Sequence, residues 1–274
     1  MNALVYIDQK RKEYPALDFL NRLAQSVAVS VTLLYVLLPE ESQQQGEEIL
    51  QRAARQLVSA PVNLLIRWGD PINVLLSEAH RDRFDLLVLQ SGVRRRNMPR
   101  LEPLDQILTH SMYPMVLILR GKDRPGRRIL ACTAGWEERL EVTRAAALLA
   151  RSLEASVTLL HVAAGTVPVM FTGLPALEES LSDVLQTDTV IARHLREAAK
   201  ILAASDVEAE LELRRGAPVD EILREVKLGQ YDLVVIGRSR VTNGLKELLM
   251  GDVMQRLVSR VPVSLLVVGE GALE

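Results

Sequence analysis

The chain has 274 residues, of which 48% are apolar and 25% are charged, and its formal net charge is -2. This charge and a content of only 3 Phe, 2 Trp and 5 Tyr argue against nucleic-acid binding, which uses basic surfaces and stacking platforms. The one cysteine, Cys132, excludes an intrachain disulfide framework, and no apolar run approaches the length of about 18 residues that spans a bilayer. The amino terminus also lacks a signal-peptide pattern, so we expect a cytoplasmic protein that binds neither nucleic acid nor membrane.

Short apolar runs alternate with segments of helical periodicity in the first part of the chain. Apolar runs bounded by polar turns are typical of buried strands. Asp70 and Pro71 mark a helix start, because Asp is a favoured N-cap and Pro is tolerated at the first helical position. The sequence predicts strands at residues 3–8, 30–38, 62–67, 84–90 and 115–119, with helices between them, including a short one at 104–111.

The pattern restarts after residues 121–126 (GKDRPG), which have the composition of a connector. Ser30–Val36 (SVTLLYV) recurs as Ser156–Val162 (SVTLLHV), and Phe84–Val88 (FDLLV) recurs as Tyr231–Val235 (YDLVV). The turn RWGDP at residues 67–71 likewise recurs as RRGAP at 214–218. The two copies of the second and third segments are separated by more residues than the two copies of the first. We attribute this difference to an insertion within residues 163–204. We infer a tandem duplication, with one domain at residues 1–122 and a second at 127–274.

Alternation of strands and helices in each half predicts the fold class. Such a pattern favours an α/β fold in which a five-stranded, doubly wound parallel sheet has helices on both faces. Right-handed crossovers then bring the loops after the first, second and fourth strands to one edge of the sheet, where folds of this kind bind ligands.

The stretch at residues 231–269 has the clearest pattern for a ligand. An apolar strand at 233–236 ends at Gly237, and a loop with Gly244 leads into a helix that contains Gly251 and ends before Pro262. Glycines between the carboxyl end of a parallel strand and a helix let backbone N–H groups approach an anion. This geometry suits a phosphate group.

This order of strand, glycines, helix and last strand resembles the ATP-binding signature of universal stress proteins, G-2x-G-9x-G-[S/T]. Gly237 matches the first glycine and Gly251 the third, with one extra residue between them. Arg240 stands at the second glycine position and Asp252 at the Ser/Thr position, while Gly244 supplies a shifted turn. The resemblance covers nearly the whole chain. It implies two tandem flavodoxin-like domains, of the adenine nucleotide alpha hydrolase-like type, whose last strands at 115–119 and 264–268 pair to form an internal pseudo-dimer.

The resemblance also implies where a nucleotide such as ATP would bind. The second half keeps the glycines, whereas the first half has Gln90 and Pro103 at the corresponding positions. Asp8 matches the family's Asp at the end of the first strand, where the second half has Ala134; Asp8 is either a ligand contact or a cap of the following segment. The expected nucleotide-binding residues are Asp8, Val162 and Ile236 near the base, and Gly237, Arg238, Arg240, Gly244, Gly251, Asp252 and Val253 near the phosphates.

Two further segments leave their role open. The basic run Arg94–Arg96 with Arg100 is either a phosphate-binding loop or a solvated one. The apolar segment at residues 167–174 is either a partner-binding flap or a lid over its own domain.

Catalytic signals are absent from the sequence. There is no nucleophile elbow, P-loop lysine or Cys/His cluster at metal spacing, the histidines are scattered, and Cys132 is expected in the core of a strand. We therefore expect a non-catalytic stress-response module, with no metal and with unknown protein partners, that functions as a pseudo-dimer or a homodimer. The alternatives are a ligand-free scaffold for protein assembly, or a weak ATPase or adenylate-transferring enzyme in which Asp252 is the candidate active group.

Overall fold

The computed structural model describes residues 1–8, 13–81, 84–90, 107–108, 112–120, 127–135, 140–163, 181–238 and 245–273, with the side chains of 245–252 excepted. Several of the predictions fall elsewhere in the chain. The basic run with Arg94–Arg96 and Arg100, the apolar segment at 167–174, Arg240, Gly244 and most of the short helix at 104–111 lie outside the described residues.

Strands and helices alternate through both halves, as predicted. In the first half they are β1 (Asn2–Tyr6), α1 (Pro15–Leu23), β2 (Ser30–Leu37), α2 (Gln43–Ala54), β3 (Val62–Trp68), α3 (Pro71–Arg81), β4 (Leu86–Gln90) and β5 (Met115–Leu119). In the second half they are β6 (Arg128–Thr133), α5 (Glu141–Leu153), β7 (Ser156–Ala163), α6 (Leu181–Gln186), α7 (Val190–Ala204), β8 (Ala209–Arg215), α8 (Pro218–Gly229), β9 (Leu233–Gly237), α9 (Leu245–Arg260) and β10 (Ser264–Val268).

All ten strands belong to one sheet with the order β3-β2-β1-β4-β5-β10-β9-β6-β7-β8. The first five strands and the last five therefore follow the same order outward from the centre. Neighbouring strands are parallel within each half, and β5 pairs antiparallel with β10 at the centre, with Leu117 opposite Leu266. The mostly parallel α/β fold and the pairing of the two last strands are confirmed, whereas the domain limits remain a prediction.

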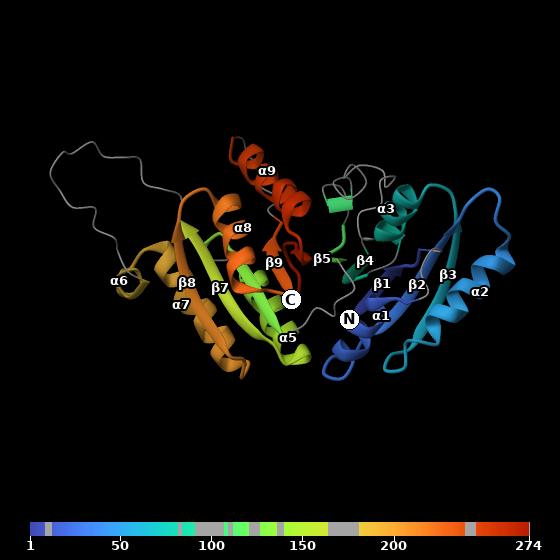
Figure 1. The fold of residues 1–274 in the computed structure, drawn as a ribbon, viewed down its shortest axis with the longest axis horizontal. Helices are drawn as coiled ribbons and strands as arrows, with labels where there is room; N and C mark the ends of the chain where they lie inside the picture. Colours follow the sequence, from blue (N-terminus) through green and yellow to red (C-terminus); the bar gives the residue numbers. More distant parts are fainter. Residues whose placement is uncertain are drawn as a thin grey trace.

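Helices cover both faces of this sheet (Figure 1), which explains why the strand sequences are continuously apolar. Along β1, Ala3 and Val5 belong to the core cluster under α1, α2, α5 and α7, and Leu4 belongs to the cluster under α3, α8 and α9. Successive side chains of a strand point to opposite faces. Both faces are thus buried, and each fully buried Leu or Val contributes about 1.5–3 kcal/mol relative to an exposed one.

Two helices of the first half, α2 and α3, start at side-chain caps. The Asp70 carboxylate accepts hydrogen bonds from the backbone N–H groups of Ile72 and Asn73 at 3.1 and 3.0 Å, so the predicted N-cap is confirmed. Ser42 and Gln45 form a capping box at the start of α2, in which each side chain binds the other's backbone N–H.

One buried ion pair occurs at matching places in the two halves. The Arg67 Nε lies 2.6 Å from Glu78 Oε1, and the corresponding Arg214 pairs with Glu225. The two arginines are the first residues of the recurring segments RWGDP and RRGAP. Both glutamates are buried on the helix that follows the turn, with exposures of 1% and 6%. The recurrence seen in the sequence thus extends to side-chain contacts.

An arginine from each half binds backbone carbonyls of the other half across the central strand pair. The Arg120 guanidinium donates to the carbonyl oxygens of Val258 and Val261, near the end of α9, where a helix leaves carbonyls without intrahelical partners. The Arg238 guanidinium donates to the Leu108 and Tyr113 carbonyls at 3.0 and 2.8 Å. These bonds fasten the two halves at the β5–β10 pairing.

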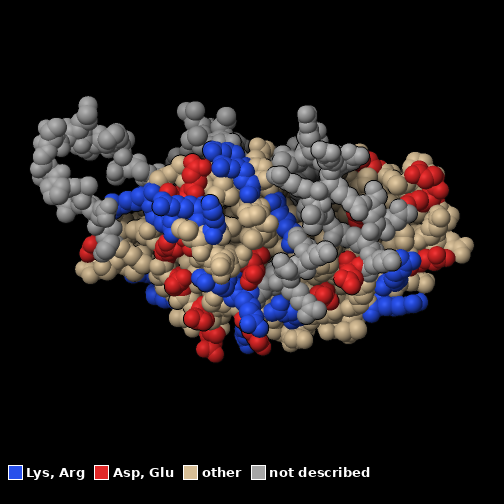
Figure 2. Space-filling model, viewed as in Figure 1, with Lys and Arg blue, Asp and Glu red and all other residues tan. Residues whose placement is uncertain are grey.

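Charges of both signs are interspersed on the face of the molecule shown in Figure 2, as expected for a chain of near-zero net charge. No helix among the described residues combines the length and the apolar character needed to cross a membrane.

Candidate functional site

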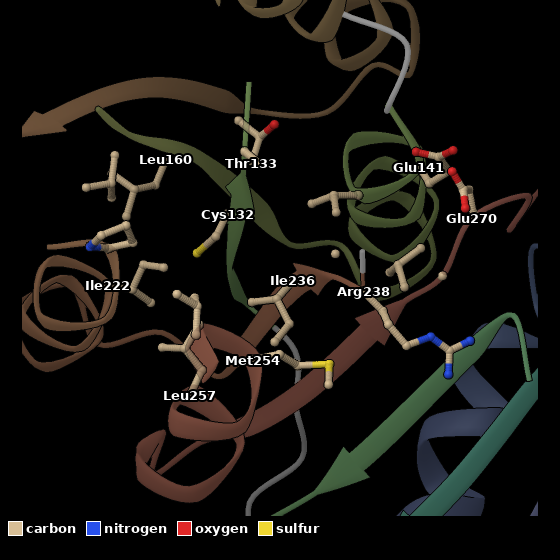
Figure 3. A pocket seen from close by; sticks show the side chains of 18 residues that line it. Cys132, Thr133, Glu141, Leu160, Ile222, Ile236, Arg238, Met254, Leu257 and Glu270 are labelled. Carbon is tan, nitrogen blue, oxygen red and sulfur yellow. The ribbon is translucent and has the colours of Figure 1, made fainter. Parts of the chain in front are cut away.

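A cavity of about 240 Å³ lies in the second half, at the carboxyl ends of β6, β7 and β9 (Figure 3). This is the sheet edge at which doubly wound folds bind ligands. Strand ends form its floor, and parts of α5, α8 and α9 form its walls. Its lining consists of Cys132, Thr133, Ala134, Glu141, Val142, Leu160, Val162, Pro218, Ile222, Ile236, Gly237, Arg238, Val253, Met254, Leu257, Val268, Gly269 and Glu270.

The walls of the cavity are mainly apolar. Figure 3 shows the Cys132 sulfur directed into the space between the strands and helices, with Ile236 and Leu257 facing it. Strand residues reach this space because β6 and β9 are hydrogen-bonded neighbours, with Cys132 opposite Ile236. An apolar enclosure of this kind suits the faces of a planar ring system.

Small residues at two strand ends keep this space open. Cys132 of β6 corresponds to Tyr6 of β1 in the first half, and Gly237 of β9 corresponds to Gln90 of β4. A Cβ atom added at Gly237 would lie 3.3 Å from Val142 Cγ2, which is closer than most real Cβ contacts. A larger side chain at either position would therefore extend into the cavity.

Carboxylates lie at one side of the cavity. Glu141 is the first residue of α5 and Glu270 follows β10, and both line the cavity (Figure 3). Arg238 is the basic residue among the described lining residues, but its guanidinium points away, toward the carbonyls of Leu108 and Tyr113. The described lining therefore combines apolar surface with the carboxyl groups of Glu141 and Glu270.

Two histidines support the end of β6 beside the cavity. The Thr133 hydroxyl lies 2.5 Å from His194 Nε2, and the Thr133 carbonyl lies 3.1 Å from His161 Nδ1. Since a carbonyl only accepts, His161 Nδ1 carries the proton. Burial lowers the pKa of His161, which favours the neutral ring in the folded protein. Gly135, with φ of +77°, packs on this ring, and a Cβ there would lie 2.7 Å from His161 Cε1.

The Cys132 thiol is poorly suited to act as a nucleophile. Burial raises the pKa of the Cys132 thiol, which disfavours the thiolate that a nucleophile needs. Among the described residues, no group of three or more His, Cys, Asp or Glu side chains is arranged to hold a metal ion.

Five of the predicted nucleotide-binding residues line the cavity: Val162, Ile236, Gly237, Arg238 and Val253. Gly251 and Asp252 lie inside α9, which begins at Leu245, and Arg240 and Gly244 are outside the described residues. Asp8 lies in the other half, where its backbone carbonyl accepts a hydrogen bond from the Tyr14 hydroxyl at 3.3 Å.

Sequence reasoning missed several lining residues. Cys132 was expected in the core; it does lie in a strand, but it also faces the cavity. Aligning the two halves could have identified it, because Tyr6 and Cys132 differ greatly in size. No sequence pattern indicated a role for Glu141, Met254 or Glu270 at the site. They come from two helices and a strand end that only the fold brings together.

The fold and the position of the cavity define a doubly wound α/β protein with a cavity at the carboxyl ends of its strands. The family model described as "Universal stress protein family" matches residues 126–269, which is more than half of the chain. The chain belongs to the universal stress protein family.

This chain is similar to individual proteins of the family over different lengths. Universal stress protein MJ0531 of Methanocaldococcus jannaschii is 28% identical over 165 residues, which cover 59% of this chain and 93% of that protein. The crystal structure of a universal stress protein from Archaeoglobus fulgidus covers 98% of both chains with a TM-score of 0.69 at 15% identity, which shows a common fold. A universal stress protein solved in complex with cAMP matches 52% of this chain and 95% of that chain, with a TM-score of 0.38 and 20% identity.

Proposed function

We propose that this chain is a non-catalytic regulatory module whose second half binds a small molecule of the nucleotide class. In this role the ligand is an occupancy signal and not a substrate. The observation that carries the proposal is the cavity at the carboxyl ends of β6, β7 and β9, five of whose lining residues coincide with positions assigned to the nucleotide by the family resemblance. The module is expected to act in the cytoplasm as a tandem pseudo-dimer.

The side chains around the cavity support a non-catalytic role. The thiol of Cys132 is held neutral by burial, and the His161 and His194 rings are engaged with Thr133.

Ligand-induced stabilisation tests the proposal. A ligand at 100 times its Kd stabilises the folded state by about 2.7 kcal/mol. We expect adenosine, AMP or ATP at millimolar concentration to raise the melting temperature of the purified full chain. The ligand should also slow labelling of Cys132, which is the one cysteine of the chain and therefore an unambiguous reporter of the cavity.

Gly237→Val should abolish both effects, because its side chain would extend toward Val142 and into the cavity. The matched control is Gln90→Val, at the corresponding position of the first half, which should leave both effects unchanged. If none of the three compounds stabilises the wild-type protein or protects Cys132, the binding role is wrong and a ligand-free scaffold becomes the better account.

A further inference from the structure

Two strands, β3 and β8, lie at the ends of the sheet. Among the described residues each pairs with a single neighbour, because β5 and β10 join the two halves at the centre. Figure 1 shows β3 and β8 toward opposite ends of the molecule. An edge strand presents unpaired N–H and C=O groups to which another strand can add. The sheet can therefore be extended at these two strands.

The backbone of β3 directs alternate residues away from the sheet. The Val31 N–H donates to the Pro61 carbonyl at 2.9 Å, so Pro61 faces β2. Because main-chain groups alternate along a strand, the residues at even positions from 62 to 68 direct their N–H and C=O groups outward. Their side chains share the face covered by α2, since Val62 and Ile66 pack against the core cluster on that side.

The two edge strands differ in charge. Native proteins commonly protect an edge strand from pairing by placing charged side chains on it. The sequence of β8, AELELRR, contains two glutamates and two arginines, whereas β3, VNLLIRW, contains Arg67 alone. Arg67 is already paired with the buried Glu78. The edge at β3 therefore lacks the charges that protect the edge at β8.

Apolar side chains are exposed along the same strand. Leu64 is 45% exposed and Trp68 is 58% exposed. Tryptophan is enriched among the residues that dominate protein–protein binding. At the position that corresponds to Trp68, β8 carries Arg215. The edge at β3 thus combines outward main-chain groups with exposed apolar area.

A second copy of β3 is complementary to this edge. In an antiparallel pair centred on Leu65, Leu64 of one copy lies opposite Ile66 of the other, and Trp68 lies opposite Val62. The outward N–H and C=O groups then bond each other, and the apolar side chains of the two copies are adjacent on one face.

Charge also favours this pairing at β3 over β8. In the pair centred on Leu65, Arg67 lies opposite Asn63, so no like charges meet. The corresponding arrangement of two β8 strands would place Glu212 opposite its own copy, which is destabilising.

The chain itself already contains a joint of this kind. The apolar strands β5 and β10 pair antiparallel, and one core cluster continues beneath helices of both halves on the same face. We propose that two copies of this chain associate through β3, with their sheets continuing as one across a two-fold axis. This interface is separate from the cavity in the second half and does not depend on a ligand.

Sedimentation velocity of the full chain tests the interface. We expect a species of twice the 30.5 kDa chain mass, whose population increases with protein concentration. Leu64→Lys should raise the dissociation constant of this dimer at least about tenfold, because the two new lysines occupy diagonal positions across the pair. The matched control is Leu228→Lys, at an exposed leucine of α8, which should leave the constant unchanged.

Disulfide trapping tests the register. Leu65 would lie opposite its own copy in a non-hydrogen-bonded pair, whose Cα separation of about 4.5 Å permits a disulfide. Leu65→Cys in a Cys132→Ser background should give a covalent dimer under mild oxidation, whereas Glu212→Cys in the same background should not.

Four results would overturn the inference: a wild-type chain that stays monomeric at submillimolar concentration, a dimer that Leu64→Lys does not weaken, absence of the Leu65→Cys cross-link, or a cross-link through Glu212→Cys. None of them bears on ligand binding in the second half, so the proposed function is tested separately.

Discussion

The two halves of the sheet have the same strand order, but they differ at the edge where a ligand would bind. In the first half the strand ends carry Tyr6 and Gln90, and in the second half the corresponding positions carry Cys132 and Gly237. The second pair lines a cavity of about 240 Å³. With the same topology, the two halves therefore differ at this edge in the volume of their strand-end side chains.

The buried polar groups at this edge differ as well. In the first half the Tyr35 hydroxyl lies 2.9 Å from both carboxylate oxygens of Glu41. In the second half the corresponding residue, His161, donates to the Thr133 carbonyl. By contrast, the Arg67–Glu78 and Arg214–Glu225 pairs recur in both halves. The contacts that hold helix to sheet recur, and those at the ligand edge have diverged.

The largest effect is expected at the boundary between the halves. Leu117 is fully buried in β5, opposite Leu266 of β10, and Leu117→Ala should lower the free energy of unfolding by about 3 kcal/mol. Because one sheet runs through both halves, we expect a single unfolding transition. Hydrogen exchange should accelerate in β4 and in β9 alike.

A substitution in β3 provides the control. Leu64→Ala replaces a leucine that is 45% exposed at the outer strand and should change stability by less than about 1 kcal/mol. If exchange became faster in β4 alone after Leu117→Ala, the two halves would be energetically independent. They would then have to be compared as two separate domains.

Much of the fold could be predicted from the sequence because its signals are local. Continuous apolar runs identify strands buried on both faces, and Asp70 with Pro71 identifies a helix start. The recurrence of SVTLLYV as SVTLLHV predicts that the two halves have the same strand order. These features depend on neighbours in the chain.

The candidate site was only partly predictable because it depends on distant contacts. The glycine pattern points to the edge that includes Ile236 and Gly237, where the cavity lies. However, nothing near Arg238 in the sequence shows that its guanidinium binds carbonyls of Leu108 and Tyr113 in the other half. The acidic side of the cavity likewise combines Glu141 and Glu270, which lie far apart in the chain.

An intermediate effect is expected when the first half is given the smaller side chain of the second. Tyr6 packs on the core cluster that includes Leu75 of α3, and its pKa is raised to about 12 by burial and by the nearby carboxylates of Asp8, Asp70 and Glu41. Tyr6→Cys should leave a void and lower the free energy of unfolding by about 2 kcal/mol, measured by denaturant titration.

Two further variants separate the loss of side-chain volume in Tyr6→Cys from the loss of the tyrosine hydroxyl. Tyr6→Phe keeps the ring and should cost less than about 1 kcal/mol. The reciprocal Cys132→Tyr should fill the second cavity and remove ligand-induced stabilisation. Equal losses for Tyr6→Phe and Tyr6→Cys would show that the hydroxyl, and not the volume, accounts for the difference between the halves.

The smallest effect is a dependence on pH that should originate in the second half. Burial lowers the pKa of His161 in the folded state, while the unfolded chain binds the proton with a pKa of about 6.5. The unfolded state therefore holds more protons below about pH 6.5, so the free energy of unfolding falls as the pH decreases through that value. We expect a loss of about 1 kcal/mol between pH 7.5 and 5.5 that His161→Gln removes.

The first half has no equivalent response at the corresponding position, because Tyr35 has a raised pKa, owing to burial and its bond to Glu41, and stays neutral throughout this range. Hydrogen exchange at pH 5.5 should therefore accelerate first in β6 and β7, whose ends His161 joins through the Thr133 carbonyl. If β1 and β2 respond to the same extent, or if His161→Gln keeps the wild-type slope, another group is responsible. In that case the divergence between Tyr35 and His161 has no consequence for stability, and the difference between the two halves is limited to side-chain volume at the cavity.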